Sequence, residues 1–437
     1  MTASAALVES DPEPPGEHQA TAVKRLRFVD WTRGFAVMAM VLWHTADAWL
    51  LPAIKVGPRF AFLRFIGGLA APGFLVLAGS GAALAAKPTG QDAPRDLATM
   101  LRRPLQIVLL GYLLRLQGWL IDGGAILRWA HSPIWLPLLL GYACLLATTL
   151  PALTARAAAA RWLMAGFVLS GIGLLQADSL APARFLRLTQ VDILQAIGAC
   201  LALLAIGQRC FGLLTRPGWL LAIAIGVALA SRPIWNLLPG PLPFPLATYL
   251  GQGQPPPGLP ALSRFPLFPW LAYACTGAAL GHFLLRAQRE SGTLGAERVV
   301  TLFALVGAFL SLNTSEAHGY IRALFEWAPW TIPPLRLAFR AGLIMVLLGF
   351  GWIWTEQGRG GLLIEYGRAS LRIYWAHMLF AYGILGTLWH KQLHYSAWLL
   401  LATPLLLLMW SFARWNLRAP RRSAPSLAEI VLEQQAK

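Results

Sequence analysis

The first long apolar segment carries ionisable side chains whose types and spacing suit proton transfer inside a membrane. Asp30, Arg33, His44 and Asp47 lie within residues 28–50, and at 3.6 residues per turn they share one stripe of a helix. An ionisable group at the centre of a bilayer costs about 2.5–3.5 kcal/mol even on the lower insertion scales, so such groups usually serve a function. We therefore expect this stripe to face protein or a wet cavity rather than lipid.

Among these residues, His44 is the best candidate for a general base, because imidazole titrates near neutral pH. Asp47 follows one turn later and is expected to fix the His44 tautomer and to stabilise the imidazolium. The structural alternative is that Asp30 and Arg33 only pair with each other at the cytoplasmic end, while His44 forms a hydrogen bond with a neighbouring helix. A guanidinium such as that of Arg33 also suits phosphate.

Three further motifs contain groups that could pack or react. The small residues of 71–81 favour close helix packing. Asp192 and Gln195 share a helical face at the start of a later apolar segment, which suits either a helix–helix hydrogen bond or a substrate contact. Tyr374 and His377 follow a basic patch on one predicted helix. A lone buried histidine is more often structural, so a direct role for His377 is the less favoured of its two interpretations.

The elements that must position these residues are membrane helices. Hydrophobic residues make up 57% of the 437, only 13% are charged, and 19 are Trp, which excludes an ordinary soluble domain. The sequence predicts an all-α, polytopic integral membrane bundle of 11–12 helices. The predicted spans are 28–50, 60–86, 104–121, 133–151, 160–176, 190–207, 218–236, 266–285, 299–312, 336–355, 371–390 and 396–415. Those at 160–176 and 299–312 are the weakest.

The distribution of Lys and Arg places both termini in the cytoplasm, so the net charge of +17 mostly reflects topology, and no nucleic-acid partner is indicated. Residues 1–22 are predicted to be a disordered cytoplasmic tail, 23–418 the membrane domain and 419–437 a C-terminal cytoplasmic tail. The Pro-rich segment 237–265 is expected to lack regular structure. Four unpaired cysteines within or beside apolar spans indicate neither disulfides nor a metal site.

Several of these motifs resemble one family when they are taken in order. The stretch from Arg25 to Gly34 is similar to the opening signature of transmembrane acyltransferases related to heparan-α-glucosaminide N-acetyltransferase. Further similarities follow in family order along the chain, at Ala71–Gly79, Asp192–Gly198, Phe265–Gly281 and Ser370–His377. The resemblance covers residues 25 to 380, and the ordered set is more specific than any single motif.

The resemblance implies transfer of an acyl group, in the first place acetyl, from cytosolic acyl-CoA to an amine or hydroxyl of a sugar on the other side of the membrane. His44 fills the superfamily's histidine position near the outer end of the first span. One departure concerns the animal lysosomal branch, which carries Asn at this position and a His further into the first loop. Here no His lies between His44 and His131, so that part of the family mechanism does not carry over.

Other roles follow from the residue chemistry once acyl-CoA is the donor. Direct attack with His44 as base is favoured over an acyl-histidine intermediate, while His377 or Tyr374 polarises the thioester carbonyl. The remaining assignments are CoA-phosphate contacts for Arg33, Arg102, Arg103 and Arg368, and acceptor contacts for Asp30, Asp192, Gln195, Tyr374 and Trp270.

A transporter or flippase for a polar molecule or lipid-linked sugar is the alternative, since such proteins also combine many spans with buried charges. The absence of a repeated Asp-x-x-Arg-Gly…His pattern after residue 220 favours the enzyme. We expect a multi-pass protein of a bacterial inner membrane, with the bilayer and acyl-CoA as partners, a possible homodimer and no metal. The acceptor and the choice between N- and O-acylation remain open.

Overall fold

The computed structural model describes residues 26–85, 96–120, 190–238, 242–251, 263–325, 333–383 and 388–418, with a few isolated positions between them. These residues form helices, turns and one isolated bridge between Leu50 and Leu393. Seven of the described helices are long and apolar enough to cross a membrane. The prediction of an all-α membrane bundle is therefore confirmed. The predicted spans at 133–151 and 160–176 and the two terminal tails lie almost wholly outside the described residues, and the orientation of the termini stays a prediction.

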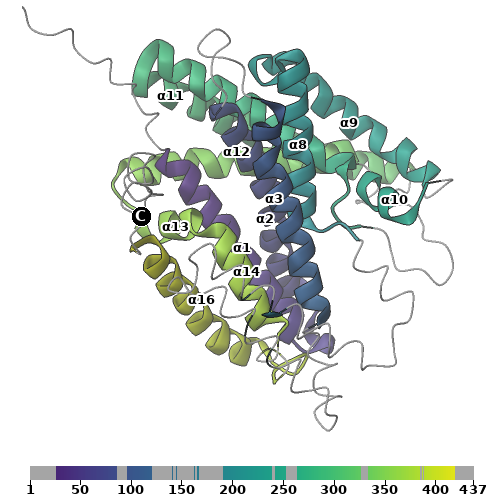
Figure 1. The fold of residues 1–437 in the computed structure, drawn as a ribbon, viewed down its shortest axis with the longest axis vertical. Helices are drawn as coiled ribbons and strands as arrows, with labels where there is room; N and C mark the ends of the chain where they lie inside the picture. Colours follow the sequence, from purple (N-terminus) through teal and green to yellow (C-terminus); the bar gives the residue numbers. More distant parts are fainter. Residues whose placement is uncertain are drawn as a thin grey trace, which may run out of the picture.

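The helices follow the predicted spans closely in most of the chain (Figure 1). Their bounds are α1 Arg27–Trp49, α2 Gly57–Leu84, α3 Leu97–Leu120, α8 Ile193–Phe211, α9 Pro217–Leu237, α10 Phe244–Leu250, α11 Leu267–Phe325, α12 Pro333–Glu356, α13 Gly361–Arg368, α14 Ser370–Ala381 and α16 Tyr395–Arg418. Helix α11 contains a break at Gly292, where φ is 59° and ψ is −138°. It therefore holds both predicted spans at 266–285 and 299–312.

Two sequence predictions need correction. The predicted span 371–390 is shorter, because α14 ends at Ala381 after 12 residues, about 18 Å of helix. Helix α13 precedes it with a break at Ala369, and the two together cover about 31 Å, enough to cross the hydrocarbon core. The Pro-rich segment 237–265 contains the helix α10, against the expectation of no regular structure.

Glycines set the closest helix contacts. A Cβ on Gly34 of α1 would lie 1.8 Å from the carbonyl oxygen of Leu363, and a Cβ on Gly367 would lie 1.8 Å from that of Asp30. Helices α1 and α13 thus touch backbone to backbone. On α2 and α11, Gly79 and Gly277 make the same kind of contact, as expected for the small-residue motif 71–81. No side chain fits at these positions, so the glycines define which helices are neighbours.

The C-terminal helices α13, α14 and α16 lie beside α1, the first helix of the chain (Figure 1). Backbone hydrogen bonds hold the end of α1 against the segment before α16: Gln392 and Leu393 both donate to the carbonyl oxygen of Trp49, at 3.0 and 2.9 Å. The Trp49 indole also donates to the carbonyl oxygen of Ala381, at 3.0 Å. The end of α14 is therefore fixed relative to the end of α1.

Candidate active site

Two histidines that are 333 residues apart in the chain meet between α1 and α14. The Nδ1 of His44 lies 2.8 Å from the Nε2 of His377, and the two rings are nearly parallel, with an interplanar angle of 12°. His377 is fully buried, while His44 is partly exposed. The structure thus joins two residues that the sequence predicted separately.

The partners of His377 determine where the protons lie. Its Nδ1 is 3.0 Å from the carbonyl oxygen of Ile373. A carbonyl can only accept, so this nitrogen carries the proton and the Nε2 of neutral His377 is an acceptor. His44 then donates from Nδ1 and keeps the lone pair on Nε2. No described residue forms a hydrogen bond with this Nε2, so His44 presents an unprotonated nitrogen to a ligand.

Two tyrosines pack edge-on against the histidine pair. The ring of Tyr374 contacts His377 at 5.5 Å between centroids, and the ring of Tyr382 contacts His44 at 5.7 Å. The hydroxyl of Tyr382 donates to Asp47 at 3.3 Å. Tyr374 is itself buried. The pair is therefore enclosed by aromatic rings that restrict both imidazoles.

The predicted contact between Asp47 and His44 is wrong. The partner of His44 Nδ1 is His377, whereas the Asp47 carboxylate accepts from Tyr382 and lies 3.8 Å from the ammonium of Lys55. Lys55 also donates to the Asp47 carbonyl oxygen. The spacing of three residues places Asp47 on the same helix face as His44, but the hydrogen-bond partner of His44 is His377 from another helix. His377 takes the orienting position that the sequence assigned to Asp47.

Asp192 and Gln195 have a structural role that the sequence did not show. Asp192 is the N-cap of α8 and forms a capping box with Gln195, whose Oε1 accepts from the Asp192 N–H at 3.2 Å. Gln195 is fully buried, and its Nε2 has no hydrogen-bond partner among the described residues. Gly111 of α3 leaves the space that the Gln195 side chain fills. The motif is thus a helix cap that leaves one buried amide donor unused.

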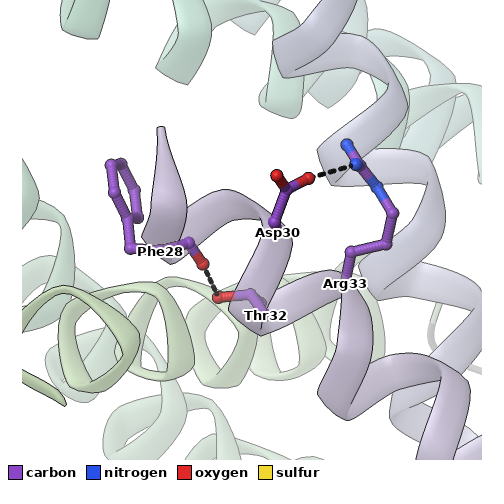
Figure 2. Close-up of polar contacts among 4 residues, drawn as sticks. All are labelled: Phe28, Asp30, Thr32 and Arg33. Carbon is purple, nitrogen blue, oxygen red and sulfur yellow. Dashed lines mark hydrogen bonds and ion pairs between the residues drawn. The ribbon is translucent and has the colours of Figure 1, made fainter. Parts of the chain in front are cut away.

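The other end of α1 holds the predicted ion pair. The Nη1 of Arg33 lies 2.9 Å from the Oδ1 of Asp30 (Figure 2). Asp30 is buried, while the side chain of Arg33 is one-quarter exposed. Figure 2 also shows the Thr32 hydroxyl, which donates to the carbonyl oxygen of Phe28 at 2.9 Å. This pair stands more than two helical turns from His44, so α1 carries two separate polar regions.

The remaining predicted residues lie at other places. Arg102 and Arg103 are exposed in the second turn of α3, and Arg368 is exposed at the end of α13. None of these three forms an ion pair with a carboxylate among the described residues. Trp270 packs between Phe265 and Tyr273 on α11. The structure brings none of these four into contact with the histidine pair.

The sequence analysis missed Tyr382 and Arg115. Tyr382 contacts both His44 and Asp47, but it lies beyond the helix that carries His377, in a turn that periodicity does not describe. Arg115 lies on α3 within electrostatic range of Tyr374, and its Nε is buried without a hydrogen-bond partner among the described residues. The sequence signal that could have identified Arg115 is its charge, which lies four residues after Gly111 in an otherwise apolar span.

The fold and this site define a helical membrane protein with a hydrogen-bonded histidine pair between two of its helices. A family model for the catalytic domain of heparan-alpha-glucosaminide N-acetyltransferase matches residues 25–312. The chain therefore belongs to this family, as its motifs predicted. The search of curated proteins gave no match. The matched range includes His44 and ends before His377.

Proposed function

We propose that the protein transfers an acyl group, in the first place acetyl, from cytosolic acyl-CoA to an amine or hydroxyl of a sugar-type acceptor on the extracytoplasmic side. The observation that carries this proposal is the hydrogen bond between His44 and His377, which leaves the Nε2 of His44 available as a base. The family match supports acetyl transfer as the reaction class.

The reaction needs one base and no acyl-enzyme. The Nε2 of His44 takes the proton of the acceptor amine or hydroxyl as that atom attacks the thioester carbonyl. The new bond to carbon forms, the carbon–sulfur bond breaks, and the CoA thiolate takes the proton back from the imidazolium. His377 accepts from Nδ1 of His44 throughout, which holds the ring in place and stabilises its charged form.

One hydroxyl beside the pair is suited to bind the acyl carbonyl. The ring of Tyr374 is buried against His377, and its hydroxyl can donate a hydrogen bond. Tyr374 also lies within electrostatic range of Asp192 and Arg115. Donors aimed at the oxygen that becomes negative are a major source of rate acceleration in acyl transfer. We assign Tyr374 to the thioester carbonyl, and the Asp192–Gln195 cap to the acceptor.

The donor would reach this site from the other end of α1. Arg33 is partly exposed there, and Arg102, Arg103 and Arg368 are exposed at helix ends. Guanidinium groups bind phosphate through paired hydrogen bonds, so these four are assigned to the CoA phosphates. About 16 Å of helix separates Arg33 from His44, and an extended pantetheine arm has to cover that distance.

The test is acyl-CoA turnover by purified protein in liposomes, with His44→Ala measured beside the wild type. CoA release from acetyl-CoA in the presence of a glucosamine-type acceptor is expected in the wild type and lost in the variant. His282→Ala is the matched control, since that histidine lies on α11 beside Phe283. Equal turnover in the wild type and His44→Ala would remove His44 from the reaction. Acceptor flux into the liposomes without any CoA release would identify a transporter.

A further inference from the structure

A pair of arginines lies on α12, away from the histidines and from the residues assigned to CoA. Arg336 and Arg340 are one helical turn apart, so they occupy neighbouring positions on one face, where like charges repel. Two adjacent positive charges on a membrane helix are unfavourable unless a negative charge lies near them.

The side chain of Arg340 is partly buried, whereas that of Arg336 is exposed. Arg340 lies within electrostatic range of the hydroxyl of Tyr273, a buried residue of α11. Its Nη2 lies next to Gly68 of α2, 3.2 Å from the position that a Cβ there would take. The guanidinium therefore sits between three helices, and glycine leaves the room that it occupies.

The described part of the chain forms no ion pair with Arg336 or Arg340. The four ion pairs that it contains use the carboxylates of Asp30, Asp47, Glu290 and Glu365, and none involves Arg336 or Arg340. Asp192 is occupied by the capping box of α8. Two neighbouring arginines close to a buried tyrosine, without an ion pair to a carboxylate of the described residues, have the composition of an anion-binding site.

The arginine pair lies at the depth of the histidine pair. Helices α1, α2 and α12 meet where Ala36, Gly73 and Ile344 are in contact, and α12 runs antiparallel to α1, because Gly351 approaches Phe28. From that meeting point Arg340 and Arg336 lie about 6 and 12 Å outward along α12, and His44 lies about 12 Å outward along α1. The arginines and His44 therefore lie at a similar depth along the helix axes.

The surface near the arginines is apolar and open. Phe62 and Phe65 of α2 are 63% and 42% exposed, and Phe65 packs against Phe339 of α12, with 6.3 Å between the ring centroids. Arg336 is exposed beside them. A ligand can reach this site from the bilayer, with an alkyl chain against the phenylalanines and its charged group beside the arginines.

We propose that Arg336, Arg340 and Tyr273 bind the phosphate of a membrane-embedded lipid, and that the acceptor is a lipid-linked sugar phosphate. Phosphate binding is independent of the proposed acyl transfer, whereas the acceptor assignment rests on it. The geometry suits such a molecule. The phosphate would lie beside the arginines, the sugar would extend toward His44, and the lipid chain would lie along Phe62 and Phe65.

The first test measures binding alone. The melting temperature of the purified wild type in detergent is compared with farnesyl phosphate, with farnesol and with inorganic phosphate. Farnesyl phosphate is expected to raise it and farnesol is not. Loss of a charged hydrogen bond in Arg340→Gln is expected to weaken the binding about tenfold, with Arg336→Gln showing a similar loss and Arg340→Lys a smaller one.

The control is Arg298→Gln, which removes an exposed arginine of α11 outside this cluster and should bind like the wild type. Equal stabilisation by inorganic phosphate and farnesyl phosphate would overturn the lipid assignment. Absence of binding, or equal binding by wild type and Arg340→Gln, would overturn the site itself. If Arg340→Gln fails to fold, Tyr273→Phe, which keeps the ring and removes the hydroxyl near Arg340, tests the same phosphate site.

The second test measures acceptor use and separates this proposal from the acyl-transfer proposal. With a prenyl-phosphate glucosamine acceptor, Arg340→Gln should raise KM about tenfold at nearly constant kcat, while KM for acetyl-CoA stays unchanged. Wild-type turnover with a soluble glucosamine acceptor and an unchanged KM in Arg340→Gln would refute the lipid acceptor but leave acyl transfer intact. Absence of turnover with any acceptor, together with farnesyl phosphate binding, would refute acyl transfer and the acceptor assignment but retain the phosphate site.

Discussion

The two ends of α1 are held in different ways. Near Asp30 and Gly34, α1 touches α13 backbone to backbone, and its ionisable groups pair within the helix. Near His44, a side-chain hydrogen bond joins α1 to α14, and one ring nitrogen is left unpaired. The first end has no room for a ligand at the helix contact, whereas the second end keeps a reactive atom available. Substitution of the contact glycines at the first end should therefore affect folding, and substitution of the histidines at the second end should affect turnover.

The largest effect is expected from His44→Ala. Removal of the base should lower kcat by about 10²–10⁴-fold, while the melting temperature stays near that of the wild type, because His44 is partly exposed and makes one hydrogen bond. Steady-state CoA release and thermal unfolding check the two halves of this expectation. If His44→Ala were unstable but its folded fraction kept the wild-type kcat, His44 would be a folding residue rather than the base.

His377→Ala should have the next largest effect. Loss of the group that accepts from His44 Nδ1 removes a hydrogen bond to a developing charge, worth about 1.5–3 kcal/mol, so kcat should fall about 10–100-fold. The measurement is kcat at saturating acetyl-CoA, with His282→Ala as the control histidine. An unchanged kcat would make His377 a packing residue and leave His44 without an orienting partner.

At the other end, Gly34→Ala should destabilise the fold. The added methyl would overlap the carbonyl oxygen of Leu363, at 1.8 Å, and overpacking of this kind costs about 1–3 kcal/mol. Gly81→Ala on α2 is the matched control, because nothing lies within 4 Å of its Cβ position, and alanine there should be neutral or slightly stabilising. Thermal unfolding in detergent compares the two. Equal melting temperatures would show that α1 and α13 are not locked together.

The smallest effect is expected from Asp47→Asn. Since Asp47 contacts Tyr382 and Lys55 rather than His44, kcat should change by less than about threefold, the worth of a weak hydrogen bond. Measuring kcat of Asp47→Asn and His377→Ala side by side shows which of the two residues orients His44. A loss in Asp47→Asn as large as that in His377→Ala would restore the interpretation from sequence alone.

The fold and the candidate base could be predicted from the sequence because they depend on local signals. Apolar runs located α1, α2 and α12 within a few residues, and the cost of buried charge marked His44 as functional. The contact between His44 and His377 could not be predicted from the sequence, because the two residues are 333 positions apart. It also depends on a helix break at Ala369, which hydropathy does not detect. The pairing of Asp47 with Lys55 depends on a turn after α1, which helical periodicity also cannot describe.

The arginine pair shows a different limit of sequence reasoning. Arg336 and Arg340 were read as part of an apolar span, and their charges had no assigned role. Their meaning depends on Gly68 and Tyr273, which come from two other helices. A charged residue in an apolar span therefore indicates a functional site. The ligand of that site can be proposed only once the residues around the charge are known.

The most direct test of the account is a double-mutant cycle on acetyl transfer with His44→Ala, His377→Ala and both together. If His377 acts through His44, the double variant should be no slower than His44→Ala alone, because the orienting group has nothing left to orient. Losses that multiply in the double variant would show that the two histidines act independently, and would contradict the central claim that they form one catalytic unit.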